Sequence, residues 1–124
     1  MAQLHVELVS VEREIWRGEA SSVTARTTEG EIGILPGHAP LLGQLAEGFT
    51  VEIVQADGRV VAAVHGGFLS VTDNGVTILA EIAELAQDVD QARAQAALER
   101  TRAENDESGA RRAEARLRAV GQPV

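Results

Sequence analysis

Apolar and polar residues alternate with a period of two in several short segments of the first part of the chain. In LHVEL, residues 4–8, leucine and valine alternate with histidine and glutamate. Residues 49–53 and 76–79 show the same alternation. A period of two is typical of a β-strand with one buried face. We therefore expect residues 1–87 to form a series of short strands.

Glycine-containing dipeptides separate these segments. They are Glu29-Gly30, Glu47-Gly48, Asp57-Gly58, Gly66-Gly67 and Asn74-Gly75. The Asn-Gly pair is the strongest signal, because a two-residue turn of type I′ needs positive φ at both central residues. Strands at about ten-residue spacing, with no helical segment between them, favour an antiparallel sandwich or barrel.

The pattern changes at Asp88, after which alanine, glutamine, glutamate and arginine dominate. These residues favour a helix. We expect Asp88 with Gln91 to cap a first helix and Ser108 to cap a second one. The predicted fold class is therefore β + α, with an N-terminal antiparallel β-sandwich over residues 1–87 and a C-terminal α-helical hairpin over residues 88–124.

The predicted hairpin has few large apolar side chains. They are Val89 and Leu98 in the first helix, and Leu117 and Val120 in the second. Burying such a side chain contributes ~1.5 to 3 kcal/mol, whereas ordering each residue costs ~1 to 2 kcal/mol. We therefore expect the hairpin to be marginally stable unless it packs against the sandwich, a ligand or a partner.

Acidic and basic residues balance within this tail, although the whole chain of 124 residues has a net charge of −8. We expect the arginines of the folded hairpin to pair with acids of the tail itself, namely Asp90, Glu99 and Glu114. The acidic chain lacks the basic face that nucleic-acid binding requires, so we expect no nucleic-acid partner.

Membrane-spanning and redox functions are also disfavoured. The longest purely aliphatic run is residues 60–64, far below the ~20 residues that a membrane-spanning helix needs, so we expect no direct membrane insertion. The chain has no cysteine, which excludes disulfides and thiolate chemistry.

Few residues have a pattern that indicates catalysis or metal binding. His5, His38 and His65 lie far apart and lack the ligand spacing of zinc motifs. Neither Ser70 nor Ser108 lies in a Gly-x-Ser-x-Gly turn. We therefore predict no metal site, no catalytic residues and no required cofactor.

The segment GEIGILPGHAPLLG, residues 30–43, is too apolar for an ordinary loop and too interrupted for a long strand. Its prolines and glycines predict a rigid connection between strands. The apolar residues that we expect to face the core are Ile32, Ile34, Leu35, Leu41 and Leu42. Glu31 and His38 remain as polar groups that can contact a partner.

The same segment, extended to GEIGILPGHAPLLGQL, resembles the epsilon-subunit family of the bacterial F-type ATP synthase. GGFLSVTDNGVTILAE at 66–81 and VDQARA at 89–94 extend the resemblance, in order, over nearly the whole chain. The resemblance implies a non-catalytic central-stalk (rotor) subunit that couples proton translocation to ATP synthesis. It also implies that the C-terminal hairpin restrains ATP hydrolysis.

The resemblance also implies the partners and location of the chain. The sandwich would bind the gamma subunit and the c-ring, with Glu31, Ile34 and His38 facing the c-ring. The hairpin would contact the catalytic alpha and beta subunits transiently. The chain would then be a peripheral part of the ATP synthase complex at the cytoplasmic face of the bacterial plasma membrane.

Some family members bind regulatory ATP on the folded hairpin through an Ile/Leu-Asp-x-x-Arg-Ala motif. In VDQARA, Asp90, Arg93 and Ala94 match this motif, and a valine replaces the larger aliphatic residue. Glu84 and Arg100 fall where family members use an acid and an arginine. The second helix is shorter than is usual in the family, which leaves the register of its arginines open.

Two other classes of protein fit the same strand content. One is a free-standing small-molecule-binding β-sandwich with a helical lid, and the other is a barrel enzyme with an acidic site. Co-purification separates these alternatives, because a rotor subunit binds a gamma-type coiled coil whereas the other two work alone.

Overall fold

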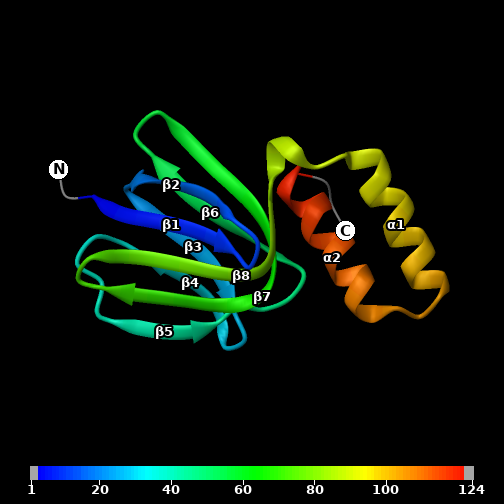
Figure 1. Ribbon diagram of the computed structural model, residues 1–124, viewed down its shortest axis with the longest axis horizontal. Coiled ribbons are helices and arrows are strands. Elements are labelled where there is room, and N and C mark those ends of the chain that lie inside the picture. Colours follow the sequence, from blue (N-terminus) through cyan, green and yellow to red (C-terminus); the bar gives the residue numbers. More distant parts are fainter. Residues whose placement is uncertain (1–2, 122–124) are drawn as a thin grey trace.

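Strands fill the first part of the chain and helices the last part in the computed structural model, which describes residues 3–121. The strands are β1 (Leu4–Ser10), β2 (Glu14–Ala20), β3 (Ser22–Thr27), β4 (Gly30–Ile34), β5 (Leu41–Gln44), β6 (Phe49–Gln55), β7 (Gly58–Thr72) and β8 (Gly75–Leu85). The 3-10 helix η1 (Ala86–Asp88) leads to the helices α1 (Gln91–Ala103) and α2 (Glu107–Ala119). The predicted order of a sandwich followed by a helical hairpin is confirmed (Figure 1).

β7 and β8 are the longest strands, and they lie at the centre of the strand order. The strand order is β2-β1-β8-β7-β6-β3-β4, and β5 pairs with β7. The first half of β7 pairs with β6, and its second half pairs with β5. Gly66-Gly67 therefore lies inside a strand and is not the turn that the sequence predicts. A Cβ at Gly67 would lie 2.0 Å from the carbonyl oxygen of Leu79, so only glycine allows this close approach.

One strand pair departs from the predicted antiparallel pattern. β1 pairs with β2 in the antiparallel sense but with β8 in the parallel sense, with Val6 opposite Val76 and Leu8 opposite Ile78. The period of two predicts that a strand has one buried face, but it carries no information on the direction of the neighbouring strand.

The core of the sandwich is almost entirely aliphatic. Its fully buried side chains include Leu8, Ile34, Ile53, Leu69 and Ile78. These residues come from five different strands, and most of their contacts join distant parts of the sequence. The alternation that predicts the strands is confirmed in β1, where Leu4, Val6 and Leu8 are buried and the residues between them are more exposed.

The turn between β7 and β8 differs from the predicted type I′ turn. Thr72 pairs with Gly75, so the two loop residues are Asp73 and Asn74, and neither has positive φ. Gly75 itself has φ of 140°, and a Cβ there would lie 2.1 Å from the carbonyl oxygen of His5. Glycine is therefore required by the close approach of β1 and not by the turn geometry.

Both helices begin at a different cap from the one predicted. The side chain of Asp90, not Asp88, accepts a hydrogen bond from the backbone nitrogen of Arg93 at 3.1 Å. Asp106, not Ser108, accepts one from the nitrogen of Gly109 at 3.0 Å. Each aspartate satisfies one free N–H group at its helix start.

The hairpin forms its own small core and touches the sandwich through one helix. Ala94 and Leu98 of α1 pack against Ala110, Ala113 and Leu117 of α2. The other face of α2 packs on β6 and β7, where its alanines meet Ala63. Figure 1 shows α2 between the sandwich and α1.

The predicted boundary between residues 87 and 88 falls within the connection from β8 to α1. The division into domains of residues 1–87 and 88–124 stays a prediction. Across residues 3–121, helices of the length and apolar character that a membrane span requires are absent.

Candidate functional site

Three exposed apolar side chains share one face of the sheet formed by β5, β7 and β8. Phe68 lies directly opposite Leu79, and Gln44 of β5 pairs with Phe68. Leu42 is two residues from Gln44 and therefore points to the same side of the sheet. We call Leu42, Phe68 and Leu79 the outer-sheet patch.

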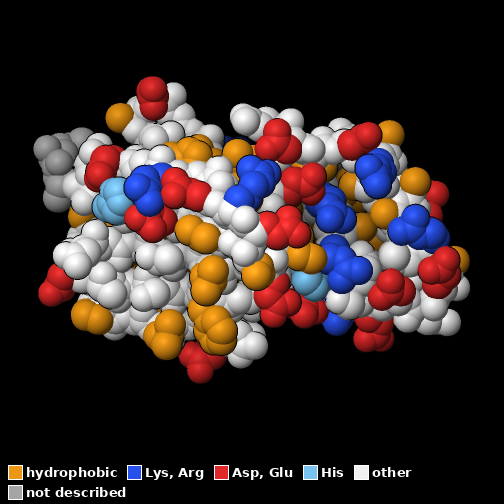
Figure 2. All heavy atoms as spheres, in the orientation of Figure 1, with side chains coloured by type: hydrophobic (Ala, Val, Ile, Leu, Met, Phe, Trp, Pro, Cys, Tyr) orange, Lys and Arg blue, Asp and Glu red, His pale blue; other side chains and the backbone are white. Residues whose placement is uncertain are grey.

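The outer-sheet patch has the character of a docking surface. Leu42 is 72%, Phe68 52% and Leu79 48% exposed. Figure 2 shows hydrophobic side chains gathered over β5 and β7 on the face that it presents. Contiguous exposed apolar groups of this kind mark sites of interaction. This patch is not among the predictions made from the sequence, although apolar residues at the polar positions of the alternation are a signal that could have indicated it.

The residues predicted to face the c-ring have different environments. Glu31 on β4 is exposed, whereas His38 in the following loop is half-buried, and its Nδ1 lies 2.6 Å from the carbonyl oxygen of Ala39. Ile34 is fully buried in the core, so its side chain is not available to a partner in this conformation. Of the predicted trio, only Glu31 and His38 present groups to the surface.

The core-facing prediction for segment 30–43 is right only in part. Ile34 is buried, and Ile32 and Leu41 pack partly against the core. Leu35 and Leu42 are exposed, at 63% and 72%. Leu42 lies in a short strand whose side chains alternate, so it points away from its inward neighbour.

Charged side chains join α2 to the sandwich. The Nε of Arg111 donates to Glu47 at 2.9 Å, and the Nε of Arg116 donates to Glu84 at 2.8 Å. The guanidinium of Arg118 donates to the Gly48 carbonyl oxygen. We call this set of contacts between α2 and the sandwich the joint.

An aromatic ring adds to the joint. The guanidinium carbon of Arg118 lies 4.7 Å from the centre of the Phe49 ring, and that of Arg26 lies 5.0 Å from it. Cation–π contacts of this type contribute ~0.5 to 1 kcal/mol at exposed sites. The arginines of α2 thus find most of their partners on the sandwich. Among the residues that the structure describes, the predicted pairing within the tail is found for Arg118 with Glu114 alone, at 3.5 Å.

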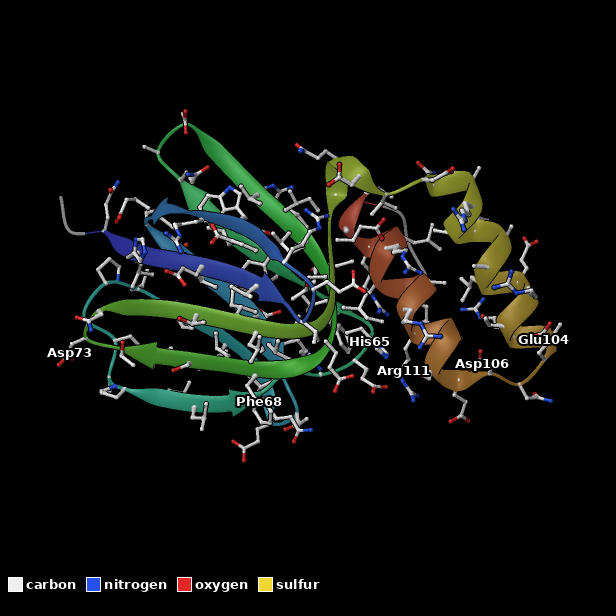
Figure 3. The ribbon with its side chains drawn as sticks, in the orientation of Figure 1. His65, Phe68, Asp73, Glu104, Asp106 and Arg111 are labelled. Atoms are coloured by element: carbon white, nitrogen blue, oxygen red, sulfur yellow. The ribbon has the colours of Figure 1, made fainter. Side chains whose placement is uncertain are left out.

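His65 is the most buried ionisable group of the joint, and Figure 3 shows it beside Arg111. Its Nε2 lies 3.3 Å from the hydroxyl of Ser108 and 3.7 Å from a carboxylate oxygen of Glu47. Serine, histidine and glutamate do not form a catalytic triad here, because both contacts involve the same ring nitrogen. The aliphatic residues 60–64 that precede His65 indicate that this histidine is buried. Its neighbours Glu47 and Ser108 were not predictable, because they are distant in the sequence.

The residues predicted to bind a nucleotide do not converge on one point. Glu84 is engaged by Arg116, and Asp90 caps α1. Arg93 and Arg100 are exposed and lie seven residues apart, on one face of α1. Ala94 is buried in the contact with α2, so its side chain does not face a ligand.

Comparisons with known proteins agree with this architecture. The family model for the ATP synthase delta/epsilon chain β-sandwich domain matches residues 3–86. The ATP synthase epsilon chain of Streptomyces avermitilis is 58% identical over 120 residues, covering 96% of each chain. The epsilon chain of Rhodococcus opacus is 64% identical over 99 residues, covering 79% of this chain and 81% of its own.

A solved structure extends the similarity to the helices. It contains the OSCP, F1 and c-ring parts of the Euglena gracilis mitochondrial ATP synthase in rotational state 1. One of its chains matches with a TM-score of 0.74 and 30% identity, covering 94% of this chain and 76% of that one. The resemblance predicted from the sequence motifs is confirmed, and the protein belongs to the family of ATP synthase delta/epsilon chains.

Proposed function

We propose that the chain acts as a rotor subunit in the central stalk of ATP synthase, has no catalytic role, and couples proton translocation to ATP synthesis. The observation that carries this proposal is the outer-sheet patch, which leaves apolar surface uncovered on a sandwich with a complete core. Similarity to a chain from an F1 and c-ring assembly supports a role of this chain within such an assembly. This similarity disfavours the alternative of a free-standing small-molecule-binding sandwich with a helical lid.

The gamma subunit is the partner that we assign to the outer-sheet patch. Replacing Phe68 and Leu79 together with serine is expected to weaken gamma binding at least tenfold, because large apolar anchors dominate interface energies at ~2 kcal/mol or more each. Val11→Ser is the matched control, since Val11 is also exposed, at 75%, but lies in the turn after β1. Unchanged gamma binding by the double variant, measured by co-purification and titration, would exclude this surface.

Glu31 and His38 are the groups that we assign to the c-ring contact. Their accessible polar atoms on a rigid segment support a contact with polar loops, and this contact would keep the chain peripheral to the membrane. The double change to alanine is expected to leave assembly of F1 intact and to lower proton-driven ATP synthesis in reconstituted vesicles. Normal synthesis by that variant would remove the assignment.

The hairpin is the element that we assign to restraint of ATP hydrolysis. Its attachment through one helix and a partly exposed joint supports release toward the alpha and beta subunits. Removing residues 88–124 is expected to raise ATP hydrolysis by the assembled enzyme and to leave ATP synthesis largely intact. If hydrolysis stays the same in an enzyme shown to retain the sandwich, the hairpin has no inhibitory role.

We also propose that regulatory ATP binds on the exposed face of α1. Arg93 and Arg100 are not engaged in an ion pair within residues 3–121, and guanidinium groups suit phosphate. Glu84 and Asp90 would have to leave their present contacts to take part. Calorimetric titration of the isolated protein with ATP, with and without Mg²⁺, tests this proposal, and Arg93→Gln is expected to remove the binding heat.

A further inference from the structure

The centre of the joint contains a histidine whose hydrogen bonding is incomplete. The side chain of His65 on β7 is covered by α2, and only 6% of the residue remains exposed. Its Nε2 meets the hydroxyl of Ser108 on α2 at 3.3 Å. Its Nδ1 is buried and has no hydrogen-bond partner among the described residues.

The neutral ring fits this environment. In the tautomer with hydrogen on Nε2, that nitrogen donates to the Ser108 hydroxyl oxygen, which also accepts from Nη1 of Arg112 at 3.0 Å. Nδ1 is then a lone-pair acceptor without a partner, and its burial is the only unmet requirement. The docked hairpin therefore accommodates a neutral His65.

The protonated ring fits poorly. Protonation places a hydrogen on Nδ1, which becomes a buried donor without an acceptor among the described residues, and a buried unsatisfied donor is unfavourable, more so when the group is charged. The new charge also faces the guanidinium groups of Arg111 and Arg112 on α2. Glu47 offers partial compensation at 3.7 Å from Nε2, but the same carboxylate already holds Arg111 at 2.9 Å.

The balance of these groups sets the direction of the pKa of His65. Burial is the largest influence and lowers this pKa below the ordinary value of 6.5, and Arg112 and Arg111 act in the same direction. Glu47, before β6, and Glu81, on β8, raise the pKa but do not overcome burial. Release of the hairpin removes α2 from the ring, so the burial that lowers the pKa of His65 is relieved and the pKa rises from its docked value.

We propose that His65 is an acid-sensitive latch, and that protonation of its buried ring releases α2 from the sandwich. The group is neutral when docked, so its contribution to docking is complete above about pH 6.5 and is lost as the pH falls below that value toward the docked pKa. Acidification therefore favours the released hairpin. The biological meaning of this latch rests on the proposed restraint of hydrolysis, whereas docking itself can be measured in the isolated chain.

Hydrogen exchange of the full chain tests the latch. Protection factors, which are corrected for the intrinsic pH dependence of exchange, are measured between about pH 7.5 and 5.5, where carboxylates stay ionised. For the release of one protonatable group, protection of the α2 amides is expected to fall by up to tenfold per pH unit below about 6.5. Protection of the β6 amides is expected to stay constant. Protection of α2 that is constant or rises on acidification would overturn the proposal.

Two histidine variants assign the effect to one side chain. His65→Gln keeps a neutral donor for Ser108, and we expect α2 protection that no longer depends on pH. His5→Gln is the matched control, because His5 is exposed and pairs with Glu19 at 3.1 Å, far from α2. It is expected to keep the wild-type pH dependence. The same pH dependence in His65→Gln as in the wild type would refute the assignment.

A titration of the wild-type ring covers the case in which His65→Gln fails to dock. Nuclear magnetic resonance of the His65 ring is expected to give a pKa below 6.5, with α2 amide shifts that change in the same pH range. A pKa above 6.5 would contradict the latch. If the latch fails while removal of residues 88–124 still raises hydrolysis, only the trigger is wrong. If the latch works but that truncation changes nothing, the inhibitory function is wrong.

Discussion

The sandwich and the hairpin bury their surfaces by different means. The sandwich encloses a continuous aliphatic core drawn from strands that are distant in sequence. The hairpin relies on alanines and two leucines, and α2 is attached to the sandwich by a small alanine contact and by arginines that meet two carboxylates and one carbonyl oxygen. The comparison teaches that one region is a permanent scaffold, whereas the other is attached by contacts that water and salt can replace.

The energies of the two kinds of contact support this difference. Burying a leucine or isoleucine contributes ~1.5 to 3 kcal/mol, and the sandwich buries many of them. Partly exposed ion pairs contribute ~0 to 1 kcal/mol each. The joint contains only a few such pairs beside a small alanine contact, so we expect docking of α2 to have a free energy of a few kcal/mol, within the range that a ligand or partner can shift.

The largest effect is expected from truncating the core of the sandwich. Ile53→Ala removes a fully buried side chain and is expected to lower the free energy of unfolding by about 2 to 5 kcal/mol. Urea denaturation followed by circular dichroism measures this loss. Leu42→Ala is the control, because Leu42 is exposed in the isolated chain and its loss is expected to cost less than about 0.5 kcal/mol. If both variants lose similar free energies of unfolding, the assignment of Ile53 to the core and of Leu42 to the surface is wrong.

A smaller global effect is expected from the equivalent truncation in the hairpin. Leu117→Ala removes a side chain that is 1% exposed, but its contacts lie within the hairpin. Hydrogen exchange is expected to show loss of protection in α1 and α2 with little change in β6 and β7. Val120→Ala, at the helix end and half-buried, serves as the control. Equal loss of protection in the strands would show that the two regions unfold as one unit.

The ion pair between Arg116 and Glu84 tests the joint itself. A double-mutant cycle with Arg116→Gln and Glu84→Gln is expected to give a coupling energy below about 1 kcal/mol, because both side chains are about one-third exposed. The coupling is measured through α2 protection and should weaken between about 0.05 and 0.5 M salt. A coupling of several kcal/mol that does not respond to salt would mean that the joint is rigid and dry.

The smallest effect is expected at the surface of the sandwich. Changing Glu31 and His38 to alanine is expected to alter the free energy of unfolding by less than about 0.5 kcal/mol. Differential scanning calorimetry measures this change. A large loss of stability would show that these side chains serve the fold, and it would remove the reason for assigning them to a partner.

The strands were predictable because one-sided burial leaves a local pattern. The alternation in β1 and in the first half of β8 predicts which residues are buried, but it does not give the ends of these strands, because β8 continues to Leu85 beyond its alternating part. The parallel pairing of these two strands was not predictable, because it depends on the path of the chain between them. The turn predicted at Gly66-Gly67 is wrong, because a glycine pair also occurs inside a strand where a neighbouring backbone comes very close.

The helical region was predictable in outline but not in its attachments. The sequence predicts Asp88 as the cap, whereas Asp88 lies in η1 and α1 starts after Asp90. The partners of Arg111 and Arg116 lie 64 and 32 residues away in the sequence, so composition alone suggested pairing within the tail. The outer-sheet patch was not predictable as one surface, because the pairing that places Phe68 opposite Leu79 and β5 beside β7 joins segments that are separated in the sequence.

Hydrogen exchange of the isolated, ligand-free protein at neutral pH tests the central claim most directly. The claim is that the hairpin is detachable from a sandwich that stays folded. The account predicts that the amides of residues 91–119 open with much lower free energy than those of residues 49–80, and that they open without the strands. Protection of residues 91–119 equal to that of residues 49–80 would contradict it.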